Sequence, residues 1–170
     1  MSALAARTRL RPSLLPRPLY ACAGASFLLG GAGVAAWNSA HRVDHGWWLA
    51  SFLVLVGGIA QVLLGAGQRT VAQPRSLAQA HRAMIWQASL WNVGTLLVPL
   101  GVMTDVRLLV VAGSGALMAA LAFLAVALRD ADPPPDERVQ LVRASFFSLL
   151  VFLAVSVVVG TILAWDLPWV

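Results

Sequence analysis

Long apolar stretches, separated by short polar ones, dominate the chain. A helix that crosses a membrane needs about 20 apolar residues, because the hydrocarbon core is about 30 Å thick and each helical residue rises about 1.5 Å. Five stretches come close to that length. The pattern therefore predicts five transmembrane helices, over residues 19–37, 47–67, 84–103, 108–128 and 145–165.

The predicted helices have no polar face. Helices of soluble proteins carry a polar stripe that repeats every 3.6 residues. Residues 108–128 contain only Ser114 as a polar side chain, and residues 151–163 contain only Ser156 and Thr161. Helices that are apolar all round need lipid around them, so we expect an all-α polytopic membrane bundle and not a soluble domain.

Composition supports the same class. Hydrophobic residues make up 59% of the chain and charged residues 11%, whereas soluble domains carry about 25% charged residues. All 12 basic side chains are arginines, against 7 acidic ones. Because the arginines lie between apolar segments, we expect anionic lipid headgroups and not nucleic acid as their partners. Arginine in place of every lysine is typical of a GC-rich genome, so we expect a bacterial source.

The arginines alternate between the loops and so predict the topology. Ten lie in the N-terminal tail and in the loops after the second and fourth helices, and the other side has only Arg42 and Arg107. Loops rich in arginine stay in the cytoplasm. We therefore predict a basic cytoplasmic tail over residues 1–18, a single five-helix domain over residues 19–170, and a C-terminus outside the plasma membrane.

Most tryptophans agree with this orientation, because tryptophan prefers the headgroup level of a bilayer. Five of the seven fall at the predicted outer ends, and two lie within the third helix. The five are Trp37, Trp47, Trp48, Trp165 and Trp169.

The first apolar stretch also resembles a signal peptide. Four arginines precede it, and it ends near the small residues 34–36. It is longer than the usual apolar region of a signal peptide, so we expect a retained helix.

Small residues recur at helical spacing and predict how the helices pack. In lipid, helices associate through close contacts of small residues and through hydrogen bonds between helices. The second and fourth helices place such residues at i, i+4 and i+8, which puts them on one face. They are Gly57, Gln61 and Gly65, and Ala112, Ala116 and Ala120.

Polar side chains at membrane depth gather in the third helix and at Gln61. We expect Gln61 and Asn92 to meet across helices two and three in a hydrogen bond. With Gln87, Thr95 and His81, they form a candidate polar site, either for a substrate or for holding helices together. No charged residue lies at mid-membrane, which argues against a proton-coupled carrier or a voltage sensor.

Histidines give the one candidate metal site. His41 and His45 flank Asp44 in an outer loop, and on a helical turn this spacing lets both rings and a carboxylate share zinc, copper or iron. Solvated loop histidines are the commoner outcome. A haem between His81 and either of these is not expected, because they lie a bilayer thickness apart. Cys22 is the only cysteine, so neither a disulfide nor a zinc site can form from thiols.

Catalytic signatures are absent from the sequence. It has no paired carboxylates in the membrane, no phosphate-binding glycine loop and no nucleophile elbow, and its loops are too short for a soluble active-site domain. We expect a non-catalytic accessory or scaffold subunit, partnered by the bilayer and by another protein or a second copy, with no cofactor required. Two alternatives stay open: a small oligomeric transporter or channel around Gln61 and Asn92, and a metal- or haem-linked redox subunit using His41 and His45.

Overall fold

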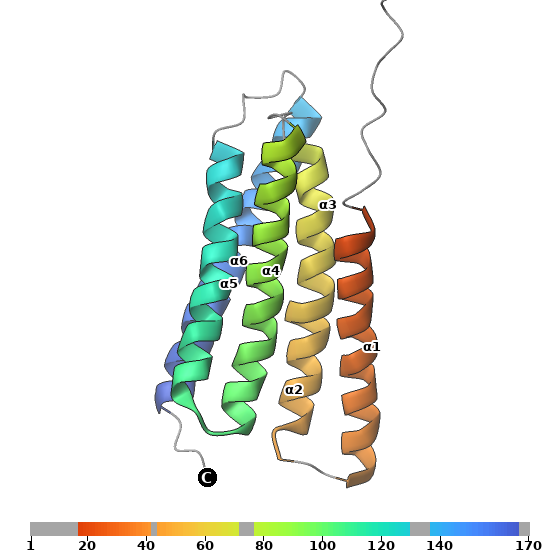
Figure 1. The fold of residues 1–170 in the computed structure, drawn as a ribbon, viewed down its shortest axis with the longest axis vertical. Helices are drawn as coiled ribbons and strands as arrows, with labels where there is room; N and C mark the ends of the chain where they lie inside the picture. Colours follow the sequence, from red (N-terminus) through yellow and green to blue (C-terminus); the bar gives the residue numbers. More distant parts are fainter. Residues whose placement is uncertain (1–16, 42–43, 72–76, 130–136, 167–170) are drawn as a thin grey trace, which may run out of the picture.

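The chain folds into a bundle of five helical rods, which alternate in direction along the sequence (Figure 1). The computed structural model describes residues 17–41, 44–71, 77–129 and 137–166. Its elements are α1 (Arg17–His41), α2 (Gly46–Phe52), η1 (Leu53–Ala60), α3 (Gln61–Val71), α4 (Leu77–Met103), α5 (Arg107–Arg129) and α6 (Glu137–Asp166). The three elements α2, η1 and α3 follow one another without a break and form the second rod.

The prediction of an all-α membrane bundle is confirmed. Four rods are long and apolar enough to cross a membrane: Tyr20–His41, Gly46–Gly67, Arg107–Arg129 and Glu137–Ile162. The remaining rod, α4, has 27 residues and so has the length, but its amide and hydroxyl side chains make it more polar. Large apolar side chains such as Leu29, Leu108 and Leu141 are at least 70% exposed, as a surface that faces lipid requires.

The helices extend beyond the predicted spans, mainly at one end of the bundle. α4 begins at Leu77 and not at 84, and α6 begins at Glu137 and not at 145. Hydrophobicity marks only the part of a helix inside the hydrocarbon, whereas Arg, Gln and Glu continue a helix into water. Glu137 also lies in the first turn of α6, where the helix dipole favours an acidic side chain. The loop between α5 and α6, which contains the prolines 133–135, lies outside the described residues.

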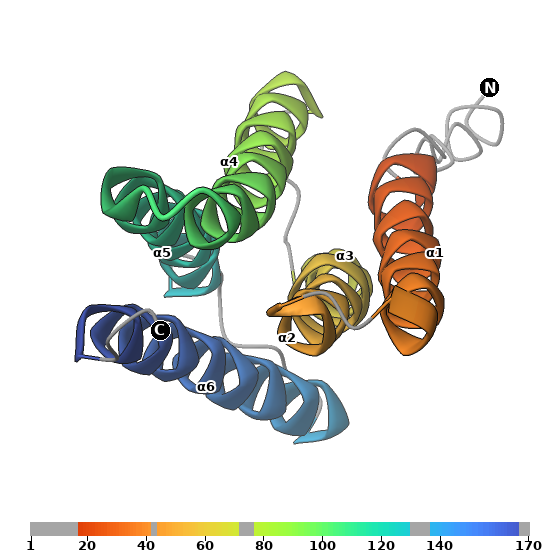
Figure 2. The same cartoon turned by 90° about the horizontal axis from the view of Figure 1, so that it is seen from below.

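The rods form two groups, seen from below in Figure 2. α1 packs on the second rod, and α4 packs along α5, while α6 contacts α5 and α3. We call the end where α1, α4 and α6 begin the arginine end. The opposite end, with Trp37, Trp47 and Trp48, is the tryptophan end.

Glycines bring α4 and α5 close together. A Cβ atom added to Gly94 would lie 2.7 Å from the carbonyl oxygen of Gly113, and one added to Gly113 would lie 2.8 Å from the backbone nitrogen of Val98. Contacts this short leave no room for any larger side chain. The two backbones therefore touch over the middle of the bundle.

The turn between α4 and α5 is equally tight. Asp105 has a φ of 54°, a left-handed conformation that Asp and Asn adopt more readily than most residues. It lets the N–H of Val106 donate to the carbonyl of Gly101 at 2.9 Å, a closing hydrogen bond typical of a helix C-terminus. So short a connection makes α4 and α5 antiparallel neighbours.

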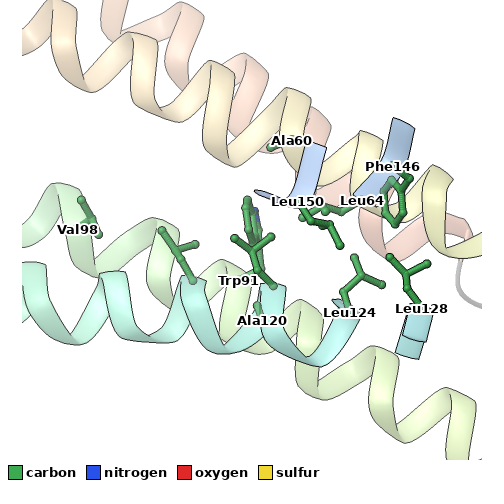
Figure 3. Close-up of a cluster of buried hydrophobic side chains, with 11 residues drawn as sticks. Ala60, Leu64, Trp91, Val98, Ala120, Leu124, Leu128, Phe146 and Leu150 are labelled. Atoms are coloured by element: carbon green, nitrogen blue, oxygen red, sulfur yellow. The ribbon is translucent and has the colours of Figure 1, made fainter. Parts of the chain in front are cut away.

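An apolar cluster fills the space where the second rod meets α4, α5 and α6 (Figure 3). Trp91 and Leu64 are each 1% exposed at its centre. At the arginine end, the Tyr20 hydroxyl donates to the carbonyl of Met84 at 3.5 Å, and Arg143 donates to the carbonyl of Leu128. These contacts join α1 to α4 and α6 to α5.

Substitution of Gly94 tests the contact between α4 and α5. We expect Gly94→Leu to lower the free energy of unfolding by about 1–3 kcal/mol, because the new side chain must push two backbones apart. Thermal unfolding in detergent measures this change. Gly115→Leu is the matched control, since a Cβ there meets nothing within 4 Å. Equal melting temperatures for the two variants would contradict the close approach.

Candidate functional site

The candidate polar site lies where the second rod meets α4. Gln61, the first residue of α3, has no exposed surface. Its Nε2 donates to Oδ1 of Asn92 at 3.4 Å, and Nδ2 of Asn92 donates to the carbonyl of Ala88 at 2.7 Å. The second bond holds the Asn92 amide against its own helix, with the oxygen turned towards Gln61. The structure thus brings together the two amides that the sequence paired.

A π-helical segment, η1, leads directly into this site. In a π-helix each N–H bonds to the carbonyl five residues back, so the helix is wider than an α-helix, and such segments are frequent at functional sites. The indole N–H of Trp91 donates to the carbonyl of Val56 within η1 at 3.2 Å. A buried indole needs such an acceptor. Trp91 therefore ties α4 to the backbone of the π-segment.

Glycines explain how α1 accommodates the wider segment. A Cβ on Gly57 would lie 2.6 Å from Cγ of Phe27, and one on Gly58 would lie 2.5 Å from Cγ of Leu28. The side chains of α1 thus occupy the space that larger residues in η1 would need. The π-helix was not predicted from the sequence. The available signal was the pair of adjacent glycines, Gly57 and Gly58, shortly before Gln61.

Two buried polar atoms of the site have no hydrogen-bond partner among the described residues. They are Oε1 of Gln61 and Oγ1 of Thr95, and neither residue has exposed surface. Thr95 follows Asn92 by three residues, so both lie on one side of α4. An unpaired buried acceptor costs about 1–3 kcal/mol. This arrangement suits a water molecule or another neutral polar group.

The other predicted members lie nearer the arginine end of α4. Gln87 is buried, with 5% of its surface exposed. His81 lies on α4, but its side chain falls outside the described residues. A role of Gln61, Asn92, Gln87, Thr95 and His81 in binding a substrate stays a prediction.

The two histidines of the candidate metal site belong to different elements. α1 ends at His41, whose ring stacks on Trp37 with a centroid distance of 3.9 Å and whose Nδ1 lies 3.2 Å from the carbonyl of Trp37. His45 has a φ of 62° and precedes α2. His45 therefore does not have the helical conformation on which the spacing argument depended. Within the described ranges, no group of three or more His, Cys, Asp or Glu side chains is placed to hold a metal ion. Metal binding by His41, Asp44 and His45 stays a prediction.

Sequence reasoning missed three polar contributors to the bundle. Trp91 bonds to the π-segment, and the hydroxyl groups of Thr161 and Ser114 lie 2.8 Å apart and join α6 to α5. Asn38 is 2% exposed near the tryptophan end of α1. A lone polar residue in an apolar helix was the available signal for Asn38, Ser114 and Thr161.

Comparison with known protein families, with curated proteins and with solved structures finds no match for the chain. Its function must therefore be inferred from its own residues.

Replacement of Trp91 tests the bond to the π-segment. We expect Trp91→Phe to lower the free energy of unfolding by about 0.5–1.5 kcal/mol, because it removes the indole hydrogen bond to the Val56 carbonyl. Trp86→Phe is the matched control on the same helix, since Trp86 is 66% exposed. Unfolding in detergent, followed by circular dichroism, measures both. A loss no larger than that of the control would show that the bond contributes nothing.

Proposed function

We propose that the protein is a non-catalytic accessory subunit that docks on another membrane protein through α1. The observation that carries this proposal is a lipid-facing stripe of small residues on α1, which no other part of the described chain covers. We call this stripe the alanine face. It consists of Ala21, Ala25, Ala32 and Ala36, all exposed.

The spacing of the alanine face places it on one side of α1. Its members lie at i, i+4, i+11 and i+15, which share a helix face, and Leu29 at i+8 projects from the same face between Ala25 and Ala32. A neighbouring side of α1 packs on the second rod, through close approaches at Gly24 and Gly31. α1 therefore has one face buried in the bundle and one free face lined by alanine.

The free face of α6 has a different character. Its exposed residues are more often bulky, among them Phe147, Phe152 and Val155, although Ser148, Ser156 and Gly160 are exposed there as well. Bulky side chains suit contact with acyl chains, whereas small ones let two helix backbones approach and gain van der Waals contact. This difference in proportion supports a protein partner for α1 and lipid for α6.

The interior supports a role without catalysis. Gln61 and Thr95 have no exposed surface, so a substrate cannot reach them in this conformation. The charged residues of the described segments lie near helix ends and in turns. A subunit of this kind contributes a binding surface to a complex. We further propose that it lies in a bacterial plasma membrane with the arginine end in the cytoplasm.

Site-directed cross-linking tests the docking surface. In a Cys22→Ser background, Ala32→Cys carrying a photoreactive maleimide should cross-link to one other protein in native membranes, because its backbone would contact the partner helix. Ala122→Cys on α5 is the matched control, since Ala122 is also exposed, and it should react with lipid alone. Mass spectrometry identifies the adducts. Equal adducts at both positions, or lipid adducts alone at Ala32, would contradict the proposal.

A small oligomeric transporter is the second candidate. The unpaired Oε1 of Gln61 and Oγ1 of Thr95, next to a π-helix, favour it. Buried polar groups in a membrane are costly and commonly mark a transport path. A conformation that opens this region would let both atoms meet a polar substrate.

Cysteine accessibility distinguishes the two candidates. In the Cys22→Ser background, Thr95→Cys should resist a charged methanethiosulfonate reagent if the interior stays closed, as for an accessory subunit. Leu117→Cys, which replaces a residue 1% exposed in the apolar cluster, gives the rate for a closed position. Labelling of Thr95→Cys about tenfold or more above this control would favour the transporter.

A further inference from the structure

A cleft opens at the tryptophan end, between α1 and α2 and beside the last residue of α4. Its volume is about 420 Å³, within the range of small-molecule sites. Residues from all three helices line it, among them Gly30, Gly33, Trp37, Asn38, Leu49 and Met103. None of the lining residues carries a charge.

One wall of the cleft is bare backbone. A Cβ atom on Gly30 or Gly33 would meet nothing within 4 Å. The two glycines lie one turn apart and so expose the backbone of α1 beside the side chains of Val34 and Trp37. Leu49 and Met103 complete the surface, which therefore fits an apolar body.

Asn38 supplies the polar feature of the cleft. It is 2% exposed, and its Oδ1 has no hydrogen-bond partner within the described segments. Gly46, which also lines the cleft, lies beside this oxygen, and any side chain there would collide with the Asn38 amide. A buried acceptor without a donor is costly. A rotation of the Asn38 amide that turns Oδ1 from Gly46 towards the cleft lets an occupant with an O–H group form this hydrogen bond.

The level of the cleft within the membrane indicates the source of such an occupant. Trp37 lines it with 61% of its surface exposed, and Trp47 and Trp48 lie close by on α2. Tryptophan marks the level at which the polar groups of lipids meet their chains. A lipid lying here has its polar group beside Asn38 and its chain directed along α1 into the membrane.

We propose that the cleft binds a neutral lipid that carries a free hydroxyl group. The hydroxyl donates to Oδ1 of Asn38, and the apolar body lies on Gly30 and Gly33. The uncharged lining favours a neutral lipid over a phospholipid headgroup. This site uses none of the residues of the alanine face, although Gly33 lies one turn from Ala36.

Photolabelling with a diazirine-bearing dioleoylglycerol tests the site, using the full chain in phosphatidylcholine nanodiscs. Mass spectrometry should map the label to the lining residues. Gly33→Leu fills the cleft and should reduce labelling about tenfold. Gly115→Leu adds the same side chain where a Cβ also meets open space, and it should label like the wild type. Both variants should keep the wild-type melting temperature, which separates loss of binding from loss of folding.

The hydroxyl contact has its own control. A probe whose hydroxyl is methylated should label the wild type about five- to tenfold less, as expected for one hydrogen bond, and Asn38→Leu should remove this difference. Equal labelling of Gly33→Leu and Gly115→Leu would overturn the site. Equal labelling by the two probes would overturn the role of Asn38.

Discussion

Lipid gives no hydrophobic gain when one helix packs on another, so this bundle depends on how closely its backbones approach. Glycines allow this close approach at two helix–helix interfaces. Between α1 and the second rod, a Cβ on Gly24 would lie 3.3 Å from the carbonyl of Gly58, and one on Gly31 would lie 3.0 Å from that of Ala50. Between α4 and α5, Gly94 faces Gly113 in the same way. These contacts fix the distances between the rods. The apolar cluster around Trp91 and the polar pairs depend on those distances.

The fold could be predicted from the sequence because the bilayer imposes a length and a polarity on every spanning segment. The centres of all five helices follow from this rule. The ends do not, because Glu137 and its neighbours continue a helix in water where hydropathy carries no signal. The π-helix was also beyond prediction, since it depends on Phe27 and Leu28 of another rod filling the space above Gly57 and Gly58.

The candidate polar site, too, could be predicted from the sequence only in part. The position of Gln61 and Asn92 along their helices and their depth in the membrane were enough to pair them. Amide side chains at mid-membrane form hydrogen bonds across helices. The bond from Trp91 to the Val56 carbonyl required the path of the backbone, and so did the burial of Asn38. The expectation for His41 and His45 assumed a continuous helix, whereas α1 ends at His41 and His45 has a left-handed conformation.

The turn at Asp105 bears on how the chain enters the membrane. α4 carries Gln87 and Asn92 in its middle part, and amides at the centre of a helix oppose its partition into lipid. Its last turn is bonded to Val106, and α5 follows at once. The two helices can therefore insert together as a hairpin, in which the strongly apolar α5 offsets the cost of its neighbour.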